Sequence, residues 1–197
     1  MARYFSGGTD STSLYDNRIQ DLFVDKSGKL WVISIDGLCT YNPCFDNFNR
    51  IISSFELGDG EFRQISAIQQ DQTNNIYISA TNSIYRIDQE KTTPQLVFHN
   101  SDFWITDFLF DENNNIWISS NNGGLTYFDT SEGTSERFLS NATDNKSLSC
   151  NNIIDISLVD NSKLWIATFG GGVNLLDTKT MILNTNKQIA YTFRRWC

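Results

Sequence analysis

Three aspartates recur at one place in a repeated pattern, and carboxylates often serve as general acids and bases. Asp25, Asp71 and Asp111 each follow a short apolar run. Paired carboxylates would suit a lyase or a glycosidase built on a rigid scaffold. Because the three occupy equivalent positions, a role in capping a turn explains all of them at once, and we favour that interpretation over catalysis.

The histidine and cysteine content also argues against an enzyme. The chain has a single histidine, His99, whereas histidine metal sites, triads and proton shuttles usually need two or more imidazoles. Its four cysteines (Cys39, Cys44, Cys150 and Cys197) form no CxxC pair, and none of their spacings is typical of zinc ligands. We therefore expect no catalytic residue, no metal ligand and no cofactor. A disulfide between Cys39 and Cys44 stays open for an oxidising compartment.

One motif suggests nucleotide chemistry. Residues 6–11 read SGGTDS, as in the glycine-rich loop with which ATP pyrophosphatases hold pyrophosphate on backbone amides. The residues after Ser11, however, do not continue as an amphipathic helix. Residues 3–14 also align, at a shift of 134 positions, with residues 137–148, where both glycines are replaced. We interpret the two segments as one repeated connector rather than as a nucleotide site.

Composition narrows the classes of partner. The 197 residues suffice for one ordinary domain, and 40% are apolar. A net charge of −8 disfavours binding to nucleic acid or to an anionic membrane surface. We find no apolar run of about 18 residues and no apolar core of a signal peptide, and so expect neither membrane insertion nor export directed by this segment.

The main signal is an internal repeat. An isoleucine followed twelve positions later by an aromatic residue occurs four times, at intervals of 40 to 48 residues. The pairs are Ile19/Trp31, Ile65/Tyr77, Ile105/Trp117 and Ile153/Trp165. Short apolar runs separated by Gly, Asn, Asp and Ser predict about four antiparallel strands in each unit. This is the period of a propeller blade.

We therefore predict an all-β fold, a single β-propeller segment over residues 1–197, forming part of a larger, typically seven-bladed propeller. The blade-like repeats are expected at about 17–60, 61–100, 101–148 and 149–190, with residues 1–16 as the outer strand and connector of a preceding blade. In the alternative, a four-unit ring, the N-terminal strand completes the last blade. An open arc would expose two large sheet surfaces and tend to self-associate.

Two local features follow from the repeat. The large aromatics Trp31, Trp117 and Trp165 are expected between adjacent blades, as core residues. The first turn of three units has Gly28, Asn74 and Asn114 at a position that favours the left-handed conformation. The fourth unit has Ser162 there and moves its carboxylate to Asp160, which predicts a differently shaped turn.

The unit Ile-x(5)-Asp-x-x-Gly-x-Leu-Trp-x-x-(Ser/Thr), followed by Gly-Leu-x-x-Tyr, and the connector Asp-x-x-Ser-Leu-x-x-Asn-x-Ile resemble the two-component regulator propeller repeat. That resemblance covers about residues 2–177. It implies the periplasmic sensor region of hybrid histidine kinase/response regulators of the Bacteroides type, which respond to oligosaccharides. It further implies that other blades or domains of a parent sensor are partners of this segment.

The resemblance transfers no ligand-binding residue, because such contacts lie outside the repeat motif. Exposed aromatics beyond the tryptophan positions are candidates for a glycan surface, although packing is the simpler role for each: Phe62, Phe103, Trp104 and Phe169. A free-standing propeller that binds another protein remains the alternative function.

Overall fold

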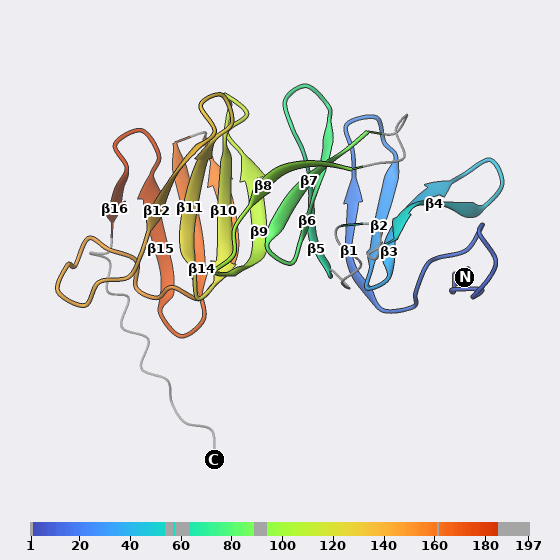
Figure 1. Ribbon diagram of the computed structural model, residues 1–197, viewed down its shortest axis with the longest axis horizontal. Coiled ribbons are helices and arrows are strands. Elements are labelled where there is room, and N and C mark those ends of the chain that lie inside the picture. Colours follow the sequence, from blue (N-terminus) through green and yellow to red (C-terminus); the bar gives the residue numbers. More distant parts are fainter. Residues whose placement is uncertain (1, 54–56, 58–63, 89–93, 161, 185–197) are drawn as a thin grey trace, which may run out of the picture.

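The computed structural model describes residues 2–53, 57, 64–88, 94–160 and 162–184. Within these ranges the chain forms sixteen strands and no helix (Figure 1). The strands make four separate antiparallel sheets of four strands each, and each sheet uses its strands in chain order. The predicted all-β architecture of four blade-like repeats is confirmed.

The bounds of the strands show the repeat directly. The first sheet contains β1 (Ile19–Val24), β2 (Leu30–Ser34), β3 (Gly37–Asn42) and β4 (Asn47–Ser53). The second contains β5 (Ile65–Gln70), β6 (Ile76–Ala80), β7 (Ser83–Ile87) and β8 (Gln95–His99). The third contains β9 (Trp104–Phe110), β10 (Ile116–Asn121), β11 (Gly124–Asp129) and β12 (Thr134–Phe138). The fourth contains β13 (Ile153–Val159), β14 (Lys163–Thr168), β15 (Gly172–Asp177) and β16 (Ile182–Asn184).

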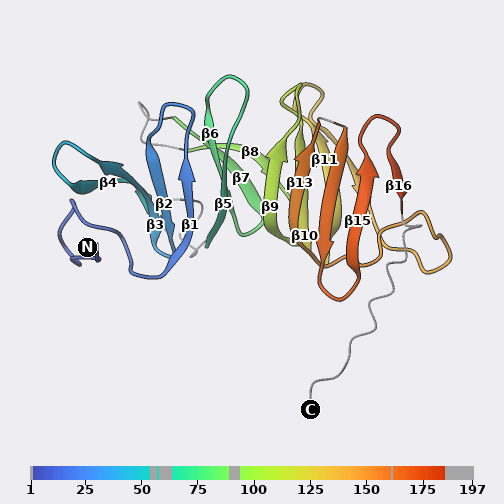
Figure 2. The same ribbon diagram turned by 180° about the vertical axis from the view of Figure 1, so that it is seen from behind.

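The four sheets stand side by side in a row, with the first and the fourth at opposite ends (Figures 1 and 2). Neighbouring sheets meet through their first strands, β1 with β5, β5 with β9, and β9 with β13. The N-terminal segment lies beside the first sheet, not the fourth. The described residues therefore form an open arc, and the four-unit ring is wrong for this structure.

Each first strand carries a bulge one residue after its repeated isoleucine. Its pairing with the second strand skips one residue, so that this residue faces away from the regular ladder. The four bulge residues are Gln20, Ser66, Thr106 and Ile154. Because bulges re-aim side chains, this repeated irregularity places four side chains at corresponding points of the arc.

The apolar core lies between the sheets, as propeller packing requires. We call the face of a sheet turned toward the next sheet its trailing face, and the opposite one its leading face. At the third junction, for example, Trp117 and Leu125 of the trailing face pack against Ile153, Ile156 and neighbouring residues of the fourth sheet. Equivalent clusters fill the first and second junctions.

The tryptophan positions do not all have the expected environment. Trp31 and Trp117 are fully buried between sheets, as predicted. The expectation is wrong for Trp165, whose exposed fraction is 45%. Trp165 lies on the trailing face of the fourth sheet, where no further sheet of the described chain covers it.

The turn residues follow the prediction closely. Gly28, Asn74 and Asn114 have φ angles of 85°, 68° and 63°, the left-handed region that Gly and Asn tolerate best. In the fourth unit the positive φ moves to Asp160, at 53°, which confirms a different turn there.

The SGGTDS segment forms the connector that the repeat predicted. Gly7 N donates to Ser13 Oγ over 2.8 Å, and Asn141 N donates to Ser147 Oγ over the same distance. Two further bonds match in the same register: Ser6 N to Asn17 Oδ1 with Ser140 N to Asn151 Oδ1, and Thr12 N to Asp10 Oδ1 with Lys146 N to Asp144 Oδ1. The segment therefore has a structural role shared with residues that lack its glycines.

Candidate ligand-binding site

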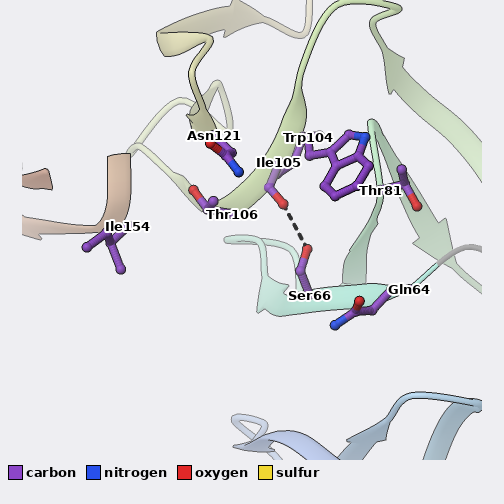
Figure 3. Close-up of a pocket in the computed structure, with 8 residues that line it drawn as sticks. All are labelled: Gln64, Ser66, Thr81, Trp104, Ile105, Thr106, Asn121 and Ile154. Carbon is purple, nitrogen blue, oxygen red and sulfur yellow. Dashed lines mark hydrogen bonds between the residues drawn. The ribbon is translucent and has the colours of Figure 1, made fainter. Parts of the chain in front are cut away.

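A pocket of about 500 Å³ opens where the first strands of the second, third and fourth sheets begin (Figure 3). Its lining comes from these strand starts and from the turns between second and third strands. The lining residues are Gln64, Ser66, Thr81, Trp104, Ile105, Thr106, Asn121 and Ile154. Three of them, Ser66, Thr106 and Ile154, are bulge residues, so the repeated irregularity of the first strands shapes this pocket.

Trp104 presents its ring to the pocket, and the local structure explains why. It is the first residue of β9, between the buried residues Phe103 and Ile105. Asn100 Oδ1 accepts Phe103 N at 2.8 Å, and Thr81 O accepts Ile105 N at 2.7 Å. With both neighbours packed inward, the alternation of a strand directs the indole outward, and its exposed fraction is 66%.

Two hydroxyl groups of the pocket join neighbouring sheets. Ser66 Oγ donates to Ile105 O over 3.1 Å, the dashed line of Figure 3, and Thr106 Oγ1 donates to Ile153 O over 2.9 Å. We call these two bonds the bulge stitches. They fix the positions of the strand starts relative to one another, so the pocket wall is held by the fold itself.

Other polar groups of the pocket remain available. Within the described ranges, the side chains of Thr81 and Asn121 make no hydrogen bond, and Gln64 Nε2 makes a long one of 3.3 Å to Gln20 Oε1. None of the described lining residues is charged. An exposed indole beside neutral donors and acceptors is equipped to bind a neutral polar ligand with an apolar face, and the described lining residues include no acid–base pair.

The four aromatic residues proposed from the sequence as candidates for a glycan surface do not lie together in the structure. Trp104 lies in the pocket. Phe103 is buried beneath the Arg137 guanidinium, 4.7 Å from the ring centre, and serves packing. Phe169 is exposed in the turn between β14 and β15, outside the pocket lining. Phe62 lies outside the described residues.

Six further residues of the pocket were not among the candidates from the sequence. Five are polar and one is apolar: Gln64, Ser66, Thr81, Thr106, Asn121 and Ile154. A signal was present, because the position after each repeated isoleucine varies while the isoleucine does not. A variable position beside an invariant one marks the surface of a repeat rather than its core.

The repeated aspartates cap turns, which confirms the interpretation made from the repeat. The Asp25 carboxylate accepts Ser27 N at 2.9 Å, Lys29 N at 3.0 Å and Trp31 Nε1 at 2.8 Å. Burial alone would raise the pKa of Asp25, but hydrogen bonds from Ser27 and Trp31 outweigh it and hold the pKa below its usual value. A carboxylate so engaged is a structural anchor.

Asp71 and Asp111 repeat the arrangement. Asp71 accepts Asn75 N at 2.8 Å and Tyr77 OH at 3.2 Å, and its pKa is likewise lowered because hydrogen bonds led by those of Asn75 outweigh the effect of burial. Asp111 accepts Asn115 N at 2.8 Å and Tyr127 OH at 3.1 Å. All three carboxylates thus fix a turn and an aromatic side chain in one step.

A different acid, Asp107, has an unusual proton affinity. It follows the bulge residue Thr106 on β9, accepts Phe108 N at 2.8 Å and lies near the carboxylate of Asp155 in the next sheet. Burial, together with the neighbouring negative charge of Asp155, raises the pKa of Asp107 to about 7. The carboxyl of Asp107, at the junction between the third and fourth sheets, therefore keeps its proton to a higher pH than an ordinary aspartate does.

The remaining candidates for chemistry are separate from one another. Cys39, Cys44 and Cys150 are free thiols, so the Cys39–Cys44 disulfide that the sequence left open is not formed. His99 is exposed at the end of β8, with Nδ1 3.0 Å from Ser83 Oγ. Among the described residues no three His, Cys, Asp or Glu side chains lie close enough together to hold a metal ion. Nor does any helix there have the length and apolar character to cross a membrane.

Comparison with known proteins finds similar folds among solved structures. No family model matches the sequence, and no curated protein does. Two similar solved structures are extracellular domains from Bacteroides thetaiotaomicron, described as hybrid two-component systems. BT4673 has a TM-score of 0.73 at 18% identity over 85% of this chain, and BT3049 a TM-score of 0.68 at 22% identity over 92%.

An enzyme shares the fold as well. Virginiamycin B lyase from Staphylococcus aureus has a TM-score of 0.67 at 13% identity, over 87% of this chain and 57% of its own. This chain spans 22% of the length of BT4673 and 23% of that of BT3049. Together with four antiparallel sheets of four strands, these likenesses identify the fold as an arc of a β-propeller.

Proposed function

We propose that this chain is a ligand-recognition segment of an extracellular two-component sensor, that it recognises neutral oligosaccharides, and that it is not a catalyst. Its repeat and connector resemble the two-component regulator propeller repeat, and its fold resembles the extracellular domains of BT4673 and BT3049. A periplasmic location is part of the same proposal.

The observation that carries the ligand class is the pocket around Trp104. Sugar rings present an apolar face of C–H groups edged by hydroxyls, and the pocket offers an exposed indole beside Thr81 and Asn121. The described lining residues carry no charge and the chain has a net charge of −8, and both favour neutral sugars over sulfated or uronic ones.

The test is a binding titration of the purified chain with neutral plant and host oligosaccharides, followed by calorimetry and by tryptophan fluorescence. Trp104→Ala should weaken binding of the responsive glycan at least tenfold, because stacking on the ring is lost. Phe169→Ala removes an equally exposed aromatic outside the pocket and should leave affinity unchanged. Equal effects of the two substitutions, or no response to any glycan, would overturn the proposal.

A further inference from the structure

One residue of the pocket, Thr81, has a backbone conformation that its side chain disfavours. Thr81 and Asn82 form the two-residue turn between β6 and β7, which is flanked by the paired residues Ala80 and Ser83. The φ angle of Thr81 is 55°, and Thr81 is the only β-branched residue with a positive φ in the described part of the chain. Two-residue hairpin turns place Gly, Asn or Asp where φ is positive, so a threonine there is strained.

The corresponding turns of the third and fourth sheets avoid this strain. In the turn between β10 and β11 the positive φ, 62°, belongs to Asn122, and in the turn between β14 and β15 a positive φ of 89° belongs to Gly170. Asparagine and glycine tolerate positive φ far better than a β-branched residue does. The fold can therefore build this turn without strain, and the turn itself does not require a threonine in the second sheet.

Hydrogen bonds from two sheets hold the strained turn in place. Thr81 N donates to Gln64 O over 3.0 Å, and Ile105 N of β9 donates to Thr81 O over 2.7 Å. Asn82 O accepts Asn100 N at 3.1 Å and Asn100 Nδ2 at 3.0 Å. Strained backbone persists only where its surroundings impose it, and these bonds to the second and third sheets do so.

The strained residue contributes an available hydroxyl to the pocket. The bond from Ile105 N brings Thr81 to the residue that follows Trp104, and both Thr81 and Trp104 line the pocket (Figure 3). The hydroxyl of Thr81 has no hydrogen-bond partner among the described residues. It is therefore fixed in position by the backbone and free to bind a ligand. Backbone strain of this kind is found mainly at ligand and active sites.

We propose that Thr81 determines which sugars the pocket accepts: its hydroxyl binds a hydroxyl at the edge of the sugar ring that stacks on Trp104. This inference rests on the proposed function and narrows the ligand class to sugars with a free hydroxyl at that edge, as against deoxy or O-methylated ones. A site built to bind a hydroxyl rejects the analogue that lacks it, because a polar group then loses its partner. The strained turn lowers stability and in return keeps the hydroxyl in place.

Three substitutions of Thr81 separate the hydroxyl from the turn, with affinity measured by calorimetry and stability by thermal melting. Thr81→Val keeps the shape and the strain but lacks the hydroxyl, and should weaken binding of the responsive glycan about five- to tenfold. Thr81→Ser keeps the hydroxyl and should bind as tightly as the wild type. Thr81→Gly should bind as weakly as Thr81→Val and yet melt about 2–4 °C above the wild type, because the strain is relieved. A residue with a purely structural role would lose affinity and stability together.

Monodeoxy and O-methyl analogues of the responsive glycan give the second readout. One of them should bind the wild type as weakly as the parent glycan binds Thr81→Val, and Thr81→Val should not distinguish that analogue from the parent. If Trp104→Ala weakens binding but Thr81→Val does not, or if Thr81→Ser is as weak as Thr81→Val, the role of Thr81 is wrong while the proposed function stands. If no glycan binds, or if Trp104→Ala has no effect, both are wrong. A Thr81→Gly variant that melts below the wild type would overturn the inference from strain, whether or not a glycan binds.

Discussion

Nε1 of Trp31 donates a 2.8 Å hydrogen bond to Oδ2 of Asp25, whereas the equivalent Nε1 of Trp117 is buried and has no partner among the described residues. In the third sheet the carboxylate of Asp111 accepts the hydroxyl of Tyr127 instead. The carboxylate of the repeated aspartate thus accepts a hydrogen bond from a different aromatic side chain in the two sheets, and only in the first sheet is the donor the indole nitrogen.

Replacing the two tryptophans by phenylalanine should therefore have unequal effects. Trp31→Phe breaks a charge-assisted hydrogen bond in addition to reducing packing, whereas Trp117→Phe removes a donor that is unsatisfied in the fold. We expect Trp31→Phe to lower the free energy of unfolding by about 1–2 kcal/mol more than Trp117→Phe does. Urea denaturation followed by circular dichroism measures both, and equal losses would contradict the role assigned to the Asp25 bond.

The capping carboxylates should make stability fall in acid. The pKa of Asp71 is lower in the folded chain than its ordinary value of 3.8. Its contribution is therefore complete above about pH 4 and disappears as the pH falls through the folded pKa. Asp71→Asn should cost about 1–3 kcal/mol at neutral pH. The variant should also show a shallower loss of melting temperature below pH 4, and an unchanged acid slope would argue against this assignment.

Asp107 should act in the opposite direction. Its pKa is raised to about 7 in the folded chain, so between its ordinary pKa of 3.8 and about 7 the folded state binds more protons than the unfolded state does. Stability from this group is full in acid and is lost as the pH rises through that window. Asp107→Asn can keep the bond from Phe108 N without a charge, and should melt at a higher temperature than the wild type at pH 8. A variant less stable than the wild type at pH 8 would show that the charged form is favoured.

If the SGGTDS segment is a structural connector, it should tolerate replacement of its first glycine, whereas a loop that binds a nucleotide through its backbone amides should not. Gly7→Asn introduces the residue found at the equivalent position 141, where the side chain accepts Thr143 N at 3.0 Å. We expect a change in unfolding free energy within about 0.5 kcal/mol. Ser147→Ala removes a hydroxyl that accepts Asn141 N and should cost about 1 kcal/mol, as should Ser13→Ala in the first connector. Denaturation of the three variants in parallel tests the equivalence, which a large loss for Gly7→Asn alone would contradict.

Much of the fold could be predicted because the repeat states the same local rules four times. An Asn or Gly at a left-handed turn and an aromatic residue twelve positions after an isoleucine are each meaningful alone, and their recurrence in register excludes coincidence. The environment of Trp165 could not be predicted in this way. The repeat determines which type of residue occupies a position, whereas the burial of that residue depends on whether a neighbouring sheet packs against it.

The pocket was harder to foresee than the core. Only Trp104 was identified as a candidate from the sequence, as an aromatic outside the repeat positions. The polar lining combines Ser66, Thr106 and Asn121, residues from two different sheets that become neighbours only through the curvature of the arc. Single-residue bulges determine where those side chains point, and short sequence patterns do not reveal a bulge when the bulged residue changes from unit to unit.

The bulge stitches also determine how far a disturbance can travel. Each stitch ties one sheet to its immediate successor, so the arc behaves as a one-dimensional chain of coupled units in which cooperativity passes only between nearest neighbours. Ligand contacts at the pocket would reach the second, third and fourth units directly and the first only through the second. Ligand binding should consequently slow amide hydrogen exchange most at β9 and least at β1. The decrease of this slowing from one sheet to the next would give the coupling free energy of a single junction.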